Sequence, residues 1–423
     1  MKVKFGMWAL CLLFVMALAG TVFVPVVSAD ENEILIDTNE LGAVDEEYLS
    51  VVAKIDLKDI KIPDLKFNEK ESMIVVDNEL SPDENVDSSS LIKAITVNSK
   101  SSVSKIPFGS IIYHSKDGIT TVFDSDGTQL FSAEDKNAVK VITPQGESPA
   151  TYVHELPSGF IKRVLDDKAF IFYEGKLILT VIDDAPNSSV KESGEFLDDN
   201  QLQTSNKLTT MWKGWIEYAE SSVISLTRFE TTWNTPKEPL NQGLRRSIAI
   251  FNGIQTDGGN GIMQPVLMWN HKDNEYEYSG SAWDYQSSLG GDSYHSAPIT
   301  VSVNNNVRGR LQWSNAYNMW WISFDNLATS QTTTYYSTQY GTNGLRLYMT
   351  LESTGAGIVA ETNGLPGDIT FNNIIIKNGA SDVPVTFYEG IASGALTYFP
   401  DLDTTFYPSQ SNPSQVKLWT GRG

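Results

Sequence analysis

The sequence has very little of the two residue types on which thiol chemistry and most zinc chemistry depend. It contains one cysteine, Cys11, which lies in an apolar run near the N-terminus, and four histidines. Disulfides and cysteine-based metal sites are therefore excluded from the rest of the chain. No His-Glu-x-x-His motif occurs, and no two histidines have the spacing of metal ligands. We predict neither a metal site nor a cofactor, and a zinc hydrolase is disfavoured.

The first 29 residues have the pattern of a secretory signal peptide. Lys2 and Lys4 precede an apolar run from Met7 to Val27, and small residues follow before Asp30. This pattern predicts a secreted protein with a signal peptide over residues 1–29, or one retained by an uncleaved N-terminal anchor. No later segment is long and apolar enough to span a membrane, so we expect no membrane contact after cleavage.

Acidic residues and tryptophans are distributed unevenly along the chain. Residues 30–200 contain 34 Asp or Glu and 16 Lys or Arg, a balance of −18, whereas residues 201–423 contain 18 and 13, a balance of −5. No tryptophan lies between residues 30 and 206, and nine lie from Trp212 onward. This contrast predicts a domain boundary near residue 200. The acidity also argues against a nucleic-acid partner, because phosphates would be repelled.

The N-terminal half divides into three predicted parts. Residues 30–104 are acidic, rich in serine and poor in aromatics, so we expect a loosely ordered pro-region. Residues 105–183 contain two hairpin patterns with turns at Asp126-Gly127 and Glu174-Gly175, which predict a small β-rich domain. Residues 184–210 are polar and charged, as is typical of a linker.

Residues 211–423 consist of short apolar runs separated by turn residues. About ten such runs in roughly 200 residues predict one antiparallel β-sandwich, so the predicted fold class is all-β. The segment "GGDSYH" (290–295) contains the Gly-Asp-Ser found in serine hydrolases. It lacks both the following glycines and a G-x-S-x-G elbow, so we interpret it as a turn.

Three residues in these runs are candidates for chemistry. Gln264 is a lone amide in "GIMQPVLMWN", where it is either a hydrogen-bonded core amide or a donor to a substrate. Glu361 ends the apolar run Ile358 to Ala360, and is either a carboxylate at a strand end or a desolvated acid/base group. Trp283 has small and polar neighbours, which favours a groove over the core that holds most strand aromatics.

The order of five segments between Met211 and Lys377 is more informative than any one of them. The segments are "MWKGWIEYAES", "RFETTWNTPKEP", "AIFNGIQTDGGNGIMQPVL", "SAWDY" and "GIVAETNGLPGDITFNNI". This series resembles the glutamic peptidases of the eqolisin type, which are secreted acid proteases with a concanavalin A-like double sheet. The family begins with a W-x-G-like strand and one ending in T-W-x-x-P. It continues with an I-L-Q strand, an aromatic segment, and a V-E segment before an F-T-N strand.

The resemblance implies an endopeptidase with Gln264 and Glu361 as its catalytic dyad. The glutamate would take a proton from water and return it to the leaving amine. The glutamine amide would stabilise the oxyanion. Substrate contacts would come from Trp283, Asp284 and two departures from the family pattern, Phe251 in place of Trp and Gln255 in place of an acidic residue. We expect a monomer that acts on polypeptides. The contrast in charge and tryptophan content near residue 200 predicts that residues 30–200 are a propeptide or spacer.

Two other functions fit the same pattern of strands. A non-enzymatic module would grip a glycan or peptide with the aromatics around Trp283, because fold alone does not determine function. A glycoside hydrolase would use Glu277 and Glu361 as a facing carboxylate pair.

Overall fold

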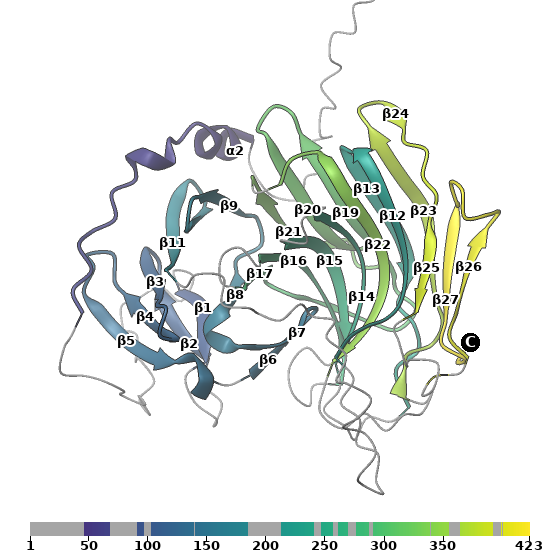
Figure 1. Cartoon of the computed structure of the whole chain (residues 1–423), viewed down its shortest axis with the longest axis horizontal. Helices are drawn as coiled ribbons and strands as arrows, with labels where there is room; N and C mark the ends of the chain where they lie inside the picture. Colours follow the sequence, from purple (N-terminus) through teal and green to yellow (C-terminus); the bar gives the residue numbers. More distant parts are fainter. Residues whose placement is uncertain are drawn as a thin grey trace, which may run out of the picture. The chain divides into compact units, whose positions relative to one another are not determined.

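A computed structural model of the chain describes residues 46–67, 91–96, 103–138, 140–184, 213–240, 247–256, 261–269, 276–286, 291–338, 340–354, 364–391, 399 and 401–423. Residues 36–423 fall in one compact unit in which strands dominate (Figure 1). The predicted all-β sandwich is confirmed. The predicted signal peptide and all of the linker except residue 184 lie outside the described residues.

One sheet of the sandwich carries the strand of Gln264. Its hydrogen-bonded order is β2-β1-β8-β17-β16-β15-β14-β22-β12-β25, and β18 pairs with β16 at its side. Its strands are β1 (Leu91–Thr96), β2 (Val103–Pro107), β8 (Val153–Leu156), β12 (Lys213–Ser225), β14 (Ser247–Thr256), β15 (Gly261–Trp269), β16 (Tyr278–Gln286), β17 (Asp292–Ser296), β18 (Ile299–Val301), β22 (Asn343–Thr354) and β25 (Tyr388–Ile391).

The facing sheet has the order β26-β27-β23-β13-β19-β20-β21-β9-β10-β11-β3-β4-β5, with β24 paired to β23. Its strands are β3 (Ser110–His114), β4 (Ile119–Phe123), β5 (Gln129–Glu134), β9 (Phe160–Leu165), β10 (Lys168–Tyr173), β11 (Lys176–Asp183), β13 (Arg228–Asn234), β19 (Asn306–Ser314), β20 (Met319–Asn326), β21 (Gln331–Ser337), β23 (Ile369–Asn378), β24 (Ser381–Asp382), β26 (Asp403–Tyr407) and β27 (Gln415–Trp419).

The remaining elements are short. A separate hairpin joins β6 (Lys140–Thr143) and β7 (Gly146–Pro149). The helices are α2 (Glu46–Ala53), η1 (Leu57–Asp59), η3 (Asp135–Asn137) and η4 (Ala150–Tyr152). No helix among the described residues is both long enough and apolar enough to cross a membrane.

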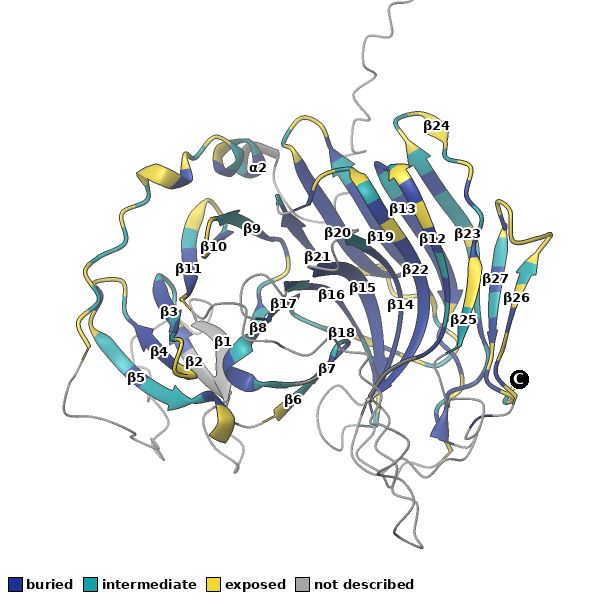
Figure 2. Cartoon of the chain, in the orientation of Figure 1, coloured by how far each residue is buried: buried dark blue, intermediate teal, exposed yellow. Residues whose placement is uncertain are grey.

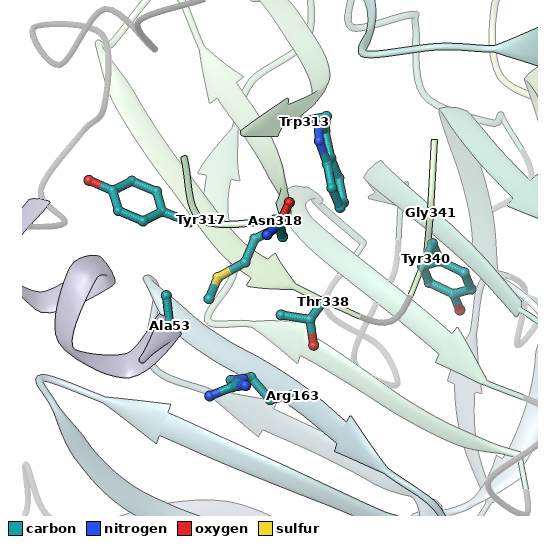
Figure 3. Close-up of a pocket in the computed structure, with 9 residues that line it drawn as sticks. Ala53, Arg163, Trp313, Tyr317, Asn318, Thr338, Tyr340 and Gly341 are labelled. Atoms are coloured by element: carbon teal, nitrogen blue, oxygen red, sulfur yellow. The ribbon is translucent and has the colours of Figure 1, made fainter. Parts of the chain in front are cut away.

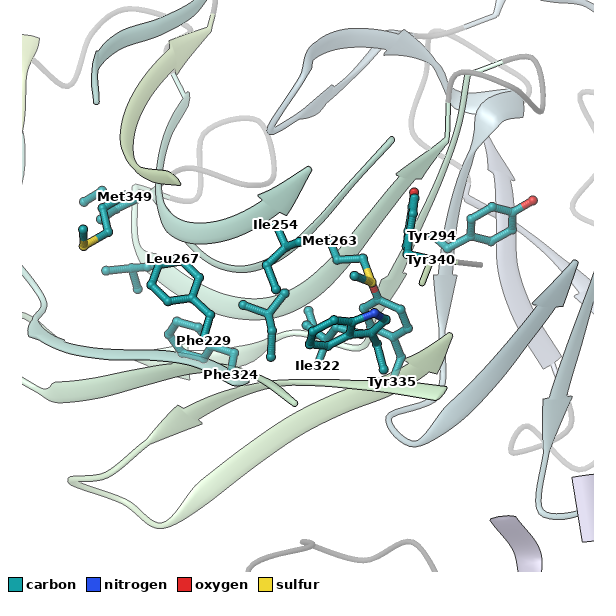
Figure 4. Close-up of a cluster of buried hydrophobic side chains, with 14 of the residues drawn as sticks. Phe229, Ile254, Met263, Leu267, Tyr294, Ile322, Phe324, Tyr335, Tyr340 and Met349 are labelled. Atoms are coloured by element: carbon teal, nitrogen blue, oxygen red, sulfur yellow. The ribbon is translucent and has the colours of Figure 1, made fainter. Parts of the chain in front are cut away.

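The main core lies between the two sheets and follows from alternation along the strands. On β15, Met263 and Leu267 point into the core, where Ile322 and Phe324 of β20 belong to the same cluster (Figure 4). Because successive side chains of a strand point to opposite faces, Gln264 lies on the opposite face of the sheet. The central strands of the sandwich, such as β14, β15 and β20, are largely buried, whereas β24, β25 and β26 are more exposed (Figure 2).

The region expected to be a small β-rich domain shares both sheets with the sandwich. Its two predicted hairpins are present as β4–β5 and β10–β11. Its strands β8 and β9 pair in parallel with β17 and β21 of the C-terminal region. These long-range pairings join the two regions by backbone hydrogen bonds, which composition along the chain does not reveal. The predicted boundaries themselves stay predictions.

Two further segments differ from the sequence-based expectations. Residues 46–67, within the range expected to be loosely ordered, form α2 and η1, because Leu49, Val52 and Leu57 bury their side chains in one apolar cluster. The segment interpreted as a turn contains β17, which is a strand because it pairs with β16 on one side and β8 on the other. Tertiary pairing outweighs the turn propensity of Gly, Asp and Ser here.

Candidate functional site

Gln264 lies in the middle of β15, on the face turned away from the main core. Its side chain is fully buried, and neither its amide nitrogen nor its amide oxygen has a hydrogen-bond partner in the described part of the chain. A buried amide that serves the fold is normally paired, because leaving one unsatisfied costs about 1–3 kcal/mol. The core-amide interpretation of Gln264 therefore lacks the contacts that it requires.

The neighbours of Gln264 in the sheet form a row across four strands. Trp283 of β16 is directly opposite on one side. On the other side, the pairs Phe251–Val266 and Ile254–Met263 keep one register, which brings Gly253 of β14 level with Gln264. Gly253 in turn pairs with Tyr348 of β22. The row thus reads Trp283, Gln264, Gly253, Tyr348, and the glycine places no side chain beside the amide.

An apolar cluster surrounds this row, and we call it the outer-face cluster. Its buried members are Val153, Ala249, Phe251, Ile262, Val266, Met268, Trp283 and Tyr348. Val141 and Ile142 of the β6–β7 hairpin pack against it, and Val153 belongs to β8. Side chains from the N-terminal region therefore cover the face that carries Gln264.

Three of the four predicted substrate-binding residues lie on this face. Trp283 is fully buried, donates its indole N–H to Ser281 Oγ at 2.6 Å, and stacks on His295 with ring centroids 4.2 Å apart. Phe251 is also fully buried. Gln255 is partly exposed and accepts a hydrogen bond from the Tyr348 hydroxyl at 3.1 Å. Substrate binding by these residues stays a prediction, since each already has a contact within the fold.

Asp284 belongs to the opposite face and has a different environment. Its carboxylate lies 2.7 Å from Lys162 Nζ of β9, and both side chains are fully buried. The Tyr340 hydroxyl donates to its other oxygen at 3.3 Å. Burial raises the pKa of Asp284 and lowers that of Lys162, against the opposing effect of the pair itself. Through this pair Asp284 joins β16 of the sandwich to β9 of the N-terminal region, and its predicted contact with substrate stays a prediction.

Glu361, the predicted partner of Gln264, lies outside the described residues. A different glutamate, Glu352 of β22, shares the face of Gln264. It is 1% exposed, neither carboxyl oxygen has a hydrogen-bond partner among the described residues, and burial raises its pKa well above the ordinary range. Sequence analysis passed over it, although Glu352 follows an apolar residue and precedes the β23 strand as Glu361 does.

The register keeps Glu352 apart from Gln264. Glu352 pairs with Ala249, which pairs with Met268, and Met268 is four residues beyond Gln264 on β15. At about 3.3 Å per residue and about 4.8 Å between strands, the two backbones are roughly 13 Å apart along the strands and roughly 10 Å apart across them. Gln264 and Glu352 are therefore not in contact. Glu277, the other predicted carboxylate, is exposed.

A separate pocket of about 400 Å³ lies where α2, β9 and the β19–β20 turn meet (Figure 3). Ala53, Arg163, Trp313 and Tyr317 are among its lining residues, whereas Gln264 is not. Arg163 Nη1 donates to the carbonyl oxygens of Val52 at 2.8 Å and Ile55 at 2.6 Å, at the end of α2. This guanidinium therefore anchors the helix to β9.

No protein-family model matches the chain, and a comparison with curated proteins found no relative. Among solved structures, the chain is similar to the Scytalido-glutamic peptidase with a peptide-based transition-state analogue, at 12% identity and a TM-score of 0.34, over 48% of this chain and 98% of that one. It is also similar to SCP-B, a member of the eqolisin family of peptidases in complex with the tripeptide Ala-Ile-His, at 11% identity and a TM-score of 0.31, over the same shares of the two chains. An alginate lyase from Alteromonas sp. 272 matches at 9% identity and a TM-score of 0.21, over 50% and 78%. Values this low assign neither a family nor an activity to the chain.

Proposed function

We propose that this protein is a secreted endopeptidase of the glutamic type, in which Gln264 and Glu361 act on a peptide bond and its attacking water. The observation that carries the proposal is Gln264 itself. It is a fully buried amide with both polar atoms unpaired within the described residues, in the strand where the motif series requires a catalytic glutamine. Unsatisfied buried polar groups in a native fold are rare and need an explanation, and catalysis is one.

An extended substrate would lie along the row around Gln264. Gly253 has no side chain, but Ile262 Cδ1 and Phe251 Cδ2 lie 3.3 Å from where its Cβ would be, so these side chains would have to move to admit a substrate. In the proposed reaction, the Gln264 side-chain N–H donates to the developing oxyanion, while its carbonyl oxygen accepts from the water. Glu361 takes a proton from that water and returns it to the leaving amine.

The packing of Val141 and Ile142 on the outer-face cluster supports a latent precursor. In the intact chain the N-terminal region covers the face that the substrate must reach. We therefore propose that activity appears after this region is cleaved or displaced, which is the role expected of a propeptide. Replacing Ile142 by Asp would weaken the apolar contact and raise activity without prior cleavage.

The test is digestion of a denatured protein substrate at a series of pH values from about 3 to about 8, a range that spans carboxyl titration. The chain is assayed before and after limited proteolysis, as wild type and as Glu361→Gln. The matched control is Glu352→Gln, which changes the same functional group on the same face away from Gln264. We expect Glu361→Gln to abolish digestion and Glu352→Gln to retain it.

The two variants also separate the competing assignments. Loss of activity in Glu352→Gln alone, with Glu361→Gln unaffected, would move the general base to Glu352. Equal activity of wild type and both variants would refute the glutamic mechanism. Absence of proteolysis in all forms, with glycan binding retained after loss of Gln264 and Glu361, would select the binding-module alternative instead.

A further inference from the structure

Two histidines and an aspartate, at least 40 residues apart in the sequence, meet in the interior. His114 ends β3, His154 lies in β8, and Asp292 begins β17. All three side chains are fully buried, and one ligand atom from each lies within 4.8 Å of the others. The spacing of these residues in the sequence does not reveal the group. Its members meet only because β8 pairs with β17 and because β3 lies in the facing sheet.

The hydrogen bonds of His114 determine which of its ring nitrogens carries a proton. Thr120 Oγ1 donates to Asp135 Oδ1 at 2.6 Å, because a carboxylate can only accept. The Thr120 oxygen must therefore accept from His114 Nδ1, which lies 2.7 Å away. In the neutral ring, His114 Nε2 then has a lone pair. A carboxylate that orients a histidine through such a chain is typical of the outer shell of metal sites.

The lone pair of His114 points into a region that already holds negative charge. His114 Nε2 lies 3.3 Å from Asp292 Oδ1 without the alignment of a hydrogen bond. His154 Nε2 donates to the same oxygen at 3.0 Å, so it becomes a ligand atom when its proton moves to Nδ1, which has no hydrogen-bond partner among the described residues. A tetrahedral ion with bonds of about 2.0–2.1 Å holds its ligand atoms roughly 3.3 Å apart. The two nitrogen–oxygen spacings are thus close to those of a ligand set, and all three atoms lie within 4.8 Å of one another.

Further carboxylates lie near the two histidines. Asp135, Asp183 and Asp292 all act electrostatically on His114, and all three are at most 8% exposed. The nearby Lys162 is engaged by Asp284.

We propose that His114 Nε2, His154 Nε2 and Asp292 bind a divalent transition-metal ion of the zinc class. Imidazole and carboxylate ligands suit such ions, and a water molecule or the second oxygen of Asp292 would complete four-coordination. The site is structural and independent of the proposed peptidase chemistry. It links β3 and β8 of the N-terminal region to β17 of the sandwich, and so stabilises the attachment of the region that covers Gln264.

The test uses the full chain, stripped with a chelator and titrated at neutral pH with Zn²⁺ or Co²⁺. We expect about one ion per chain by elemental analysis after gel filtration, and a visible absorption band of tetrahedral Co²⁺. His154→Gln should remove both. Thr120→Val keeps every ligand and removes only the orienting hydroxyl, so affinity should fall about 10- to 100-fold, as for other outer-shell changes.

Controls distinguish a metal site from a site that merely stabilises the fold. His295→Gln removes a histidine of β17 that is outside the ligand set, and should bind Zn²⁺ as wild type does. Circular dichroism verifies that each variant is folded. If His154→Gln does not fold, the wild-type titration decides alone. A wild-type chain that binds neither ion at micromolar concentration, or a folded His154→Gln that binds both unchanged, would overturn the proposal.

Discussion

The buried pair of Lys162 and Asp284 offers a quantitative test of how the N-terminal region is attached. Lys162 belongs to β9 and Asp284 to β16, their charged atoms are 2.7 Å apart, and both side chains are fully buried. Removing one partner of such a pair leaves the other charge buried and unpaired, which costs about 3–5 kcal/mol. We therefore expect Lys162→Met to lower the free energy of unfolding by about that amount.

The pair itself contributes much less than this cost. Burial shifts the pKa of each partner toward its neutral form, which indicates that desolvation outweighs the attraction between them. Replacing both residues, as Lys162→Met with Asp284→Asn, removes the two buried charges together. The double variant should recover most of the loss, because substituting apolar or neutral groups for a buried pair is often neutral or stabilising by about 1–4 kcal/mol.

Urea unfolding followed by tryptophan fluorescence measures both effects. Every tryptophan after the N-terminal run lies at or beyond Trp212, so the signal reports on the sandwich while Lys162 lies in the N-terminal region. A single transition that moves to lower urea in Lys162→Met shows that the two regions unfold together. An unchanged midpoint in that variant, or a double variant as unstable as the single one, would refute the reasoning.

Three other predictions follow from buried groups. Burial raises the pKa of Glu217 to about 9. Between pH 4.5 and 9 the carboxyl group therefore loses its proton only in the unfolded chain. The free energy of unfolding then falls with rising pH, by up to about 1.4 kcal/mol per pH unit. Glu217→Gln keeps the acceptor of the Thr404 hydroxyl and should remove this slope in urea unfolding at several pH values; an identical slope would contradict it. Gln264→Leu should raise the unfolding free energy by about 1 kcal/mol or more while abolishing proteolysis, and a loss of stability would show that the amide has a partner. Gly280→Ala should lower the melting temperature through a cost of about 1–3 kcal/mol, because the added Cβ would lie 1.9 Å from Phe324 Cε1; a wild-type melting curve would show that the ring can move aside.

Local patterns were sufficient to predict much of the fold. The hairpin β10–β11 turns at Glu174 and Gly175, both with positive φ, as its Glu-Gly turn predicts. The alternation along β15 likewise predicts one face for Met263 and the other for Gln264. These features depend on neighbours within a few residues, so the sequence contains the information directly.

The candidate site could be predicted only in part. Gln264 was found from its place in the motif series, but its unpaired state became visible only with the surrounding strands present. Asp284 was predicted to contact substrate from the family resemblance, and its buried partner Lys162 could not be foreseen because it is 122 residues away. The buried carboxyl of Glu352 gives no sign in the sequence, because desolvation depends on what packs above it.

By itself, the sequence determined the all-β class, the hairpins and the glutamine of the central strand, since strand period and turn chemistry are local properties. Only the tertiary structure decided that the N-terminal region shares both sheets, that β6 covers the outer-face cluster, and that His114, His154 and Asp292 meet. The physical reason is that these features depend on parallel pairings between distant segments, such as β8 with β17. Hydrogen bonds of that kind join backbones regardless of side chain, so no spacing or motif in the sequence predicts them.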